Sequence, residues 1–188
     1  MLRDHPDLIT AMRRDDDAWI RLAASAAFDV HRVHGAYVSY DGRGAIAVAP
    51  YDDLDPDDCL AQIILHELCH FAAEGPASRH LADWGLDNTD DRHVDREHLA
   101  LWVQRALVDP HRLADVLAPT TDFRPWYDAH LDAPVPPAAV DIAAALRATP
   151  LGRAIDQQLA AIGGTVDQYL AHIGTAGAPF LRHRQSRR

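Results

Sequence analysis

The chain has 188 residues, of which 48% are hydrophobic, so it is long enough for one domain with a substantial core and too short for two large ones. It carries 18 basic and 28 acidic residues, and this net charge of -10 argues against direct nucleic-acid binding, which needs clustered positive charge. All the basic residues are arginine, which excludes Schiff-base chemistry and the phosphate-binding lysine of a P-loop.

No apolar run approaches the roughly 20 residues of a membrane span, and no apolar segment typical of a signal peptide follows the N-terminus. We therefore expect a soluble, cytoplasmic protein without membrane contact. The two cysteines, Cys59 and Cys69, form no disulfide framework and are expected to be buried thiols. Basic residues gather only at residues 182–188, which are expected to be a disordered end.

The first elements predicted along the chain are helical. Residues 6–34 show a broken 3.6-residue periodicity that indicates one or two helices, with a start near residues 15–17 and a C-cap at Gly35. Residues 36–40 and 45–49 are short β-branched or aromatic runs around a Gly-rich turn, so they predict a hairpin.

An apolar helix is predicted next, over residues 59–73. Asp57 or Asp58 would cap its N-terminus, and Gly75 followed by Pro76 would end it. This helix carries the most informative motif of the sequence.

The rest of the chain reads mainly as helices separated by loops. A short helix over residues 77–84, a polar loop over 86–92 and a long helix over 94–108 come first. Further helices are predicted at residues 111–117, 138–148, 151–162 and 166–173, with Gly163 and Gly164 separating the last two.

These elements together predict an α+β fold that is mainly helical and zincin-like, with a small antiparallel sheet next to the motif helix. In metallopeptidases with this motif, a strand that precedes the active helix lies beside it, which is the order found here. The Pro-rich connector over residues 133–137 is the candidate boundary. We expect a metal-binding catalytic domain over residues 1–132 and a helical extension over residues 133–188 packed on the same domain.

The motif is His66-Glu67-Leu68-Cys69-His70. Helical positions four apart lie about 40° from a common line, so His66 and His70 can bind one ion. Glu67 lies about 100° around the helix from His66, beside the ion, where it can orient or deprotonate a bound water. A purely structural pair of polar residues is the alternative, but unpartnered charged groups are costly inside an apolar helix.

A third protein ligand is expected, because catalytic sites of this kind use about three. Glu97 is the favoured residue: it starts a helix that can pack across the motif helix, and glutamate is scarce, with only Glu67, Glu74 and Glu97 in the chain. A first-turn helix residue is the structural alternative for Glu97. His93 and His98 are the alternative ligands, within a wider set of candidates formed by His80, Asp83, Asp87, Asp90, Asp91, His93, Asp95, Glu97 and His98.

Residues 60–108 resemble the elongation factor P hydroxylase family. The matching residues of the motif segment, without a gap, are His66, Glu67, His70, Phe71, Gly75, Arg79, Leu81, Asp83, Trp84 and Gly85. Asp91-Arg92, Glu97, Gln104 and Ala106-Leu107 resemble later parts of the family pattern. The segment Leu86-Asp87-Asn88 departs from the aromatic run of the family, and the loop before Glu97 is shorter.

The resemblance implies a hydroxylase that uses non-haem Fe(II), held by His66, His70 and Glu97, on a lysine-like side chain of a basic protein similar to elongation factor P. It further implies that Arg79, Asp83 and Arg92 contact the substrate or support the ligands, with a structural ion pair as the alternative for each.

Two other functions remain open. A zinc metallopeptidase or related hydrolase would use Glu67 as its general base. A metal-binding or interaction protein without catalytic activity is the third possibility.

Overall fold

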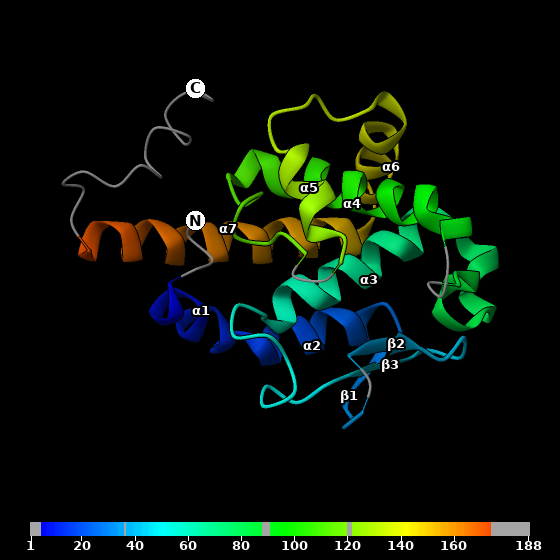
Figure 1. Cartoon of the computed structure of the whole chain (residues 1–188), viewed down its shortest axis with the longest axis horizontal. Coiled ribbons are helices and arrows are strands. Elements are labelled where there is room, and N and C mark those ends of the chain that lie inside the picture. Colours follow the sequence, from blue (N-terminus) through cyan, green and yellow to red (C-terminus); the bar gives the residue numbers. More distant parts are fainter. Residues whose placement is uncertain (1–4, 36, 88–90, 120–121, 174–188) are drawn as a thin grey trace.

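Helices make up most of the chain, and a three-stranded sheet lies along one side of them (Figure 1). The computed structural model describes residues 5–35, 37–87, 91–119 and 122–173. The helices are α1 (Pro6–Arg13), α2 (Asp16–Ser25), α3 (Leu60–Glu74), α4 (Val94–Val108), α5 (Arg124–Ala129), α6 (Pro137–Arg147) and α7 (Pro150–His172). The strands are β1 (Asp29–Arg32), β2 (Val38–Tyr40) and β3 (Ala45–Val48), and the 3-10 turns are η2 (Pro76–His80), η3 (Ala82–Gly85), η4 (Asp91–His93) and η5 (Asp109–His111). The prediction of a mainly helical fold is confirmed.

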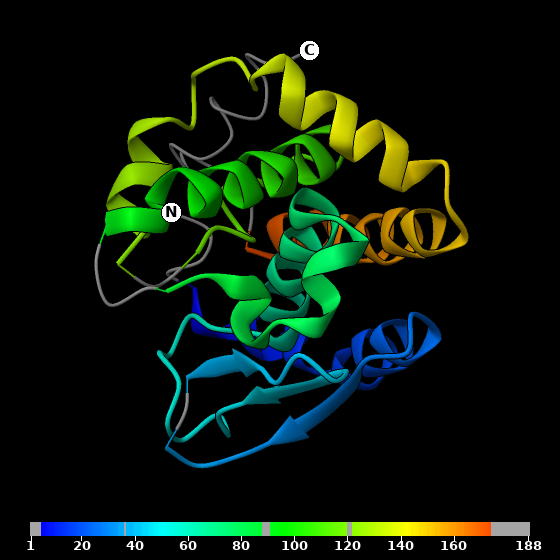
Figure 2. The ribbon, with the colours of Figure 1, turned by 90° about the vertical axis from the view of Figure 1, so that its right-hand side faces the viewer.

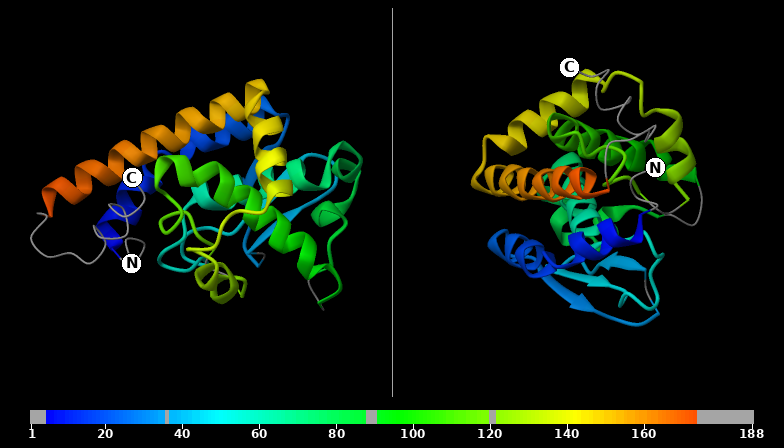
Figure 3. Two further views of the ribbon diagram at one scale, coloured as in Figure 1. Left: turned by 90° about the horizontal axis from the view of Figure 1, so that it is seen from above. Right: turned by 90° about the vertical axis from the view of Figure 1, so that its left-hand side faces the viewer.

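Helix α3 occupies the middle of the fold. Figure 2 shows it between the sheet on one side and α4 on the other. It packs against α1, α2, α4 and α6, while α7 runs beside α1 and α2 (Figure 3). This central position explains why ten residues of α3 are buried, among them polar side chains that need partners inside the protein.

The sheet is mixed, with the order β1-β3-β2. Strand β2 pairs antiparallel with β3, as the predicted hairpin requires, but β1 pairs parallel with β3 in the register Asp29 opposite Ala45. The prediction of a purely antiparallel sheet was therefore wrong. The additional strand β1 exists because α2 ends at Ser25. Ala27 has a φ of 58°, a left-handed conformation that stops the helix and leaves the following residues to pair with β3.

The predicted helix up to residue 34, with Gly35 as its cap, was wrong for the same reason. After the turn, Phe28 enters the core and residues 29–32 form β1. The ladder to β3 satisfies the backbone of this segment, and this non-local pairing overrides the local helical pattern.

Four other predicted elements differ from the observed ones. Residues 77–84 form the turns η2 and η3 in place of a helix, and the helix predicted over 111–117 is replaced by the end of η5 followed by turns and irregular structure. The expected helices over 151–162 and 166–173 are one continuous helix, α7. Tertiary packing along α7 supports the helical conformation through Gly163 and Gly164 despite their low propensity.

A continuous hydrophobic core joins the helices and the sheet. It contains side chains from α1, α2, α3, α4, α6 and α7, so residues on both sides of the Pro-rich connector share it. Trp19, Trp84, Tyr40 and Phe28 are among its largest fully buried members. Within the part of the chain that the structure describes, no helix has the length and apolar character needed to cross a bilayer.

Candidate metal centre

Helices α3 and α4 bring together the three side chains predicted to bind a metal. His66 and His70 come from successive turns of α3, and Glu97 comes from the first turn of α4. The Nε2 atoms of the two histidines are 3.0 Å apart, and Glu97 Oε2 lies 3.2 Å from Nε2 of His70 and 3.6 Å from Nε2 of His66. These residues are the group in the described chain whose ligand atoms could hold one ion.

The spacing of these atoms suits a divalent transition metal. Two ligand atoms that are each about 2.1 Å from an ion lie about 3.0 Å apart for an octahedral angle and about 3.4 Å apart for a tetrahedral one. The three observed spacings, 3.0, 3.2 and 3.6 Å, cover both values. The donor set of two imidazoles and one carboxylate fits iron(II) and zinc alike.

The three side chains are largely shielded from water. The side chains of Glu97 and His70 are 5% and 4% exposed, and that of His66 is 22% exposed. Burial opposes the charge on Glu97, but hydrogen bonds and charge from His66 and His70 prevail and hold its pKa well below the usual range. Burial likewise opposes a charge on His66, yet Glu97 raises the pKa of this imidazole. The carboxylate thus stays ionised beside the two imidazoles, which is the state in which it can bind a metal ion.

Gln104 fixes the orientation of His66. Its Oε1 lies 3.0 Å from His66 Nδ1, and its Nε2 donates to the backbone carbonyl of Leu117 at 2.6 Å. Because the amide oxygen is an acceptor, Nδ1 donates to it, which leaves Nε2 as the ring atom that faces Glu97 and could bind an ion. Metal-binding histidines commonly have such a partner. No hydrogen-bond partner for His70 Nδ1 is present among the described residues.

Glu67 lies next to the three candidate ligands and has a separate partner. Its Oε2 accepts a hydrogen bond of 2.8 Å from the indole Nε1 of Trp84. Glu67 is only 5% exposed, and it contributes to the wall of the cavity above the ligands. The indole can only donate, so it holds the carboxylate as an acceptor beside the site.

A cavity of about 700 Å³ opens over the ligand group. Strand β2, helices α3, α4 and α5, and the turn η3 contribute to its walls. One wall is aromatic: the rings of His98 and Trp126 stack at 3.8 Å with an angle of 6° between their planes, and Phe123 lies edge-on to His98. The cavity is large enough to admit a side chain or a small molecule to the ligands.

Acidic groups dominate the charged lining of the cavity. Besides Glu67 and Glu97, the carboxylates are those of Asp83, Asp91 and Asp122. None of the described lining residues is an arginine, although the chain has 18. This lining suits a neutral or cationic ligand better than an anionic one.

The three residues expected to contact substrate differ in their positions. Asp83 lines the cavity, and its Oδ1 accepts a hydrogen bond of 2.8 Å from the backbone N–H of Tyr40. Arg79 and Arg92 do not line it. Arg79 donates to the carbonyls of Ala26 and Ala27, both at 2.9 Å, and lies over a ring of the core, and Arg92 forms an exposed ion pair with Asp87. The structure thus places Arg79 and Arg92 in structural contacts.

The alternative third ligands lie outside the ligand group. His93 Nδ1 accepts a hydrogen bond of 2.8 Å from the backbone of Asp87, and His98 stacks on Trp126. The remaining described candidates, His80, Asp83, Asp87, Asp91 and Asp95, are not part of the group either. Asp90 and the basic segment 182–188 lie outside the described residues.

The structure adds two polar residues that had been given no role. Gln62 lies one turn before His66 on the same stripe of α3, lines the cavity and is 5% exposed, and its Oε1 has no partner in the described chain. Gln104 lies two turns after Glu97. The spacing of four residues from Gln62 to His66, and of seven from Glu97 to Gln104, is the signal that could have identified both.

The chain matches no family model, no curated protein and no solved structure. Function is therefore inferred from the chemistry of the ligand group and of the cavity over it.

Proposed function

We propose that this chain is a metal-dependent hydroxylase similar to the elongation factor P hydroxylases. In this proposal His66, His70 and Glu97 hold one iron(II) ion, and the substrate is a lysine-like side chain of a basic protein in the cytoplasm. The observation that carries it is the convergence of two imidazoles and one buried carboxylate at the base of an open cavity. A bound ion with three protein ligands on one side keeps positions open for oxygen and substrate.

Hydroxylation sets requirements that an assay must meet. The iron would supply oxygen activation: one oxygen atom enters a C–H bond, and the other leaves as water. The balance requires two electrons and two protons, so an external two-electron reductant such as ascorbate must be present. The chain's own residues would orient the substrate and exclude water.

The cavity lining supports a cationic side chain as the substrate. Carboxylates of Asp91 and Asp122 line the cavity together with the rings of Phe123 and Trp126. An ammonium group gains from carboxylates by charge and from aromatic faces by cation–π attraction. An extended alkyl chain ending in an amine, as in lysine, could use both.

A zinc hydrolase of zincin-like fold is the second candidate, and the position of Glu67 favours it. The carboxylate lies at the cavity wall beside the ligands, where a general base for a metal-bound water is needed. The edge strand β2 also lines the cavity next to α3, in the place where a peptide substrate could add as a further strand.

Metal content and oxygen dependence test the proposal. Protein purified without oxygen should contain iron at one ion per chain. With ascorbate and oxygen it should add one oxygen atom to lysine in a basic protein or peptide, as measured by mass spectrometry. His66→Ala should abolish both iron content and product, while His111→Ala, on the distal turn η5, should leave both unchanged.

Stoichiometric zinc, together with peptide cleavage that Glu67→Gln abolishes, would replace the hydroxylase by the hydrolase. Protein that binds neither metal would contradict both.

A further inference from the structure

The turn that carries Trp84 has an unfavourable backbone. Asp83 and Trp84 have φ angles of 45° and 58°, the left-handed region that side chains with a Cβ rarely adopt. Two such residues in succession persist only when surrounding contacts hold them, and conformations of this kind concentrate at functional sites.

This backbone aims the indole of Trp84 at Glu67. The ring is 1% exposed, it stacks on Tyr40 at 4.0 Å, and its Nε1 donates to Glu67 Oε2 at 2.8 Å. The carboxylate of Asp83 holds the other side of the turn through the backbone N–H of Tyr40. The orientation of Glu67 thus depends on the conformation of residues 83 and 84.

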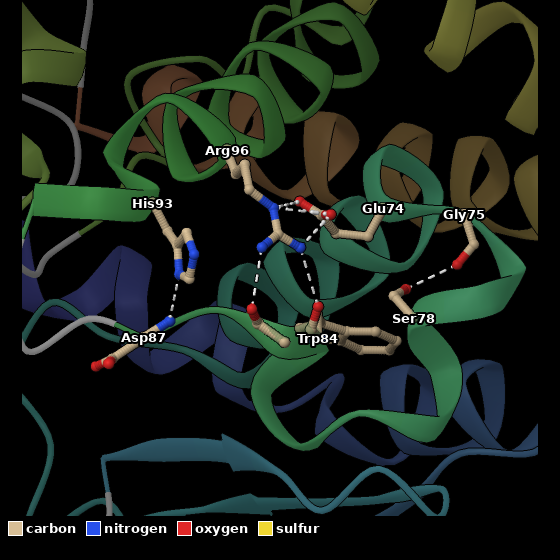
Figure 4. Close-up of polar contacts among 8 residues, drawn as sticks. Glu74, Gly75, Ser78, Trp84, Asp87, His93 and Arg96 are labelled. Carbon is tan, nitrogen blue, oxygen red and sulfur yellow. Dashed lines mark hydrogen bonds and ion pairs between the residues drawn. The ribbon is translucent and has the colours of Figure 1, made fainter.

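Arg96 binds the backbone of the same turn (Figure 4). Its Nη2 donates to the carbonyl of Trp84 at 3.1 Å, and its Nη1 donates to the carbonyl of Gly85 at 3.0 Å. The guanidinium also pairs with both carboxylate oxygens of Glu74, with Nε at 3.0 Å from each. Glu74 is 11% exposed and Arg96 is 35% exposed, so this is a partly buried, fully bonded ion pair.

These contacts join the parts of the candidate metal centre. Arg96 precedes the ligand Glu97 on α4, and Glu74 is four residues after the ligand His70 on α3. One guanidinium therefore connects both ligand-bearing helices with the turn that orients Glu67. A lysine at this position could pair with Glu74 as a point charge, but it has no planar fork for two carbonyls as well.

We propose that Arg96 is a positioning residue of the metal centre, which holds Glu67 in place through the left-handed turn at Asp83 and Trp84. That the position of Glu67 matters for activity rests on the proposed function, whereas the effect of Arg96 on the turn and on the bond between Trp84 and Glu67 does not. If Arg96 had only a structural role, its substitution would lower the stability of the protein without changing the hydrogen bond between Trp84 and Glu67.

The chain offers a matched control in Arg147. Its Nη2 donates to the carbonyls of Ala106 and Leu107, at 2.8 and 3.0 Å, and its Nε lies 3.3 Å from Asp156 Oδ1. Like Arg96, it binds two consecutive carbonyls and one carboxylate, and it is 29% exposed. It does so at the opposite end of α4 from Glu97.

The indole N–H signal of Trp84 in a ¹H–¹⁵N correlation spectrum, assigned with Trp84→Phe, tests the proposal. In metal-free protein, Arg96→Met and Arg96→Lys should shift this signal and increase its hydrogen-exchange rate at least tenfold. Arg147→Met should lower the melting temperature as well but leave the Trp84 signal at its wild-type position. Glu74→Gln keeps the arginine but weakens its ion pair, so it should also shift the Trp84 signal and speed its exchange. This variant serves as the test if Arg96→Met does not fold.

A wild-type exchange rate in Arg96→Lys and Glu74→Gln would overturn the proposal, as would an equal acceleration in Arg147→Met. Metal affinity, measured in parallel, should fall in Arg96→Met and not in Arg147→Met. If wild-type protein binds no divalent metal, the proposed function fails, but the exchange experiment still decides the role of Arg96.

Discussion

His66 and Gln104 face each other across α3 and α4, with 3.0 Å between Nδ1 of the imidazole and Oε1 of the amide. Gln104 is fully buried, and its other amide atom donates to the carbonyl of Leu117, so the amide cannot rotate without losing both bonds. This arrangement directs Nε2 of His66 toward Glu97 before any metal binds.

We expect Gln104→Leu to weaken metal binding about 10–100-fold, the usual effect of removing such a partner. Gln104→Glu keeps an acceptor for His66, so its metal affinity should stay near the wild type. It also places a carboxylate against the Leu117 carbonyl, which should lower the stability of the fold. Both variants should be less stable. Metal titration by calorimetry, with thermal unfolding in parallel, separates the two effects, and equal affinities in wild type and Gln104→Leu would contradict the assignment.

Glu97 should be required for metal retention. Removal of its charge in Glu97→Gln should reduce bound metal to the level of His66→Ala, because a carboxylamide is a much weaker ligand than a carboxylate. Asp95→Asn is the matched control, since Asp95 is an exposed acid in the same first turn of α4. If Glu97 only interacted with the helix dipole, both variants would lose about a few tenths of a kcal/mol of folding stability and keep their metal. Elemental analysis after dialysis distinguishes these outcomes.

The stability of the metal-free protein should depend on pH through His66 and Glu97. The raised pKa of His66 contributes stability that is complete below the ordinary value of 6.5 and is lost as the pH rises through the raised pKa. The lowered pKa of Glu97 contributes stability that is present above 4.5 and is lost as the pH falls through the lowered pKa. The pair should therefore stabilise the metal-free protein most between pH 4.5 and 6.5.

Added metal should reverse this trend on the alkaline side. Metal binds deprotonated imidazole, so the stabilisation that it provides should grow as the pH rises above 6.5. Urea unfolding with a chelator or with added metal, compared with Glu97→Gln, measures both effects. A pair contribution that increases above pH 6.5 in the metal-free protein would contradict this assignment.

Local patterns in the sequence predicted the two helices that form the candidate metal centre. The helix expected over residues 59–73 is observed as Leu60–Glu74, and the one expected over 94–108 is observed as Val94–Val108. The spacing of His66 and His70 is a property of a single helix, so it could be read without tertiary information.

The supporting contacts depend on tertiary structure and were not predicted. The turn at Trp84 uses left-handed conformations at residues that disfavour them, so no propensity indicates it. The bonds from Arg96 to Glu74 and from Gln104 to Leu117 join segments 22 and 13 residues apart. Strand β1 likewise depends on its parallel partner β3, which lies beyond the next strand in the chain.

The two cysteines should be unreactive in the folded protein. Both are buried, and burial raises the pKa of Cys59 from 9.0 to about 12 and raises that of Cys69 as well. A rise of this size lowers the thiolate fraction of Cys59 about a thousandfold. We expect negligible labelling by a thiol reagent at mildly alkaline pH, and complete labelling of both in urea. Ala160→Cys, at an exposed position of α7, should label rapidly in the folded protein. Fast labelling of Cys59 or Cys69 without urea would contradict their burial.

Two glycines of α7 should respond in opposite ways to the same substitution. A Cβ at Gly164 would meet no atom within 4 Å, and this residue lies inside the continuous helix. Gly164→Ala should therefore stabilise the protein by about 1 kcal/mol, the difference in helix propensity. A Cβ at Gly152 would lie 2.0 Å from the carbonyl oxygen of Leu146, where α6 turns into α7, so Gly152→Ala should destabilise by about 1–3 kcal/mol.

Urea unfolding of the two variants measures both signs. A stability loss in Gly164→Ala would mean that the chain is not helical there, as the sequence pattern had predicted for Gly163 and Gly164. A gain in Gly164→Ala together with a loss in Gly152→Ala is the result expected for a helix that continues through Gly164 and whose first turn packs closely against the end of α6.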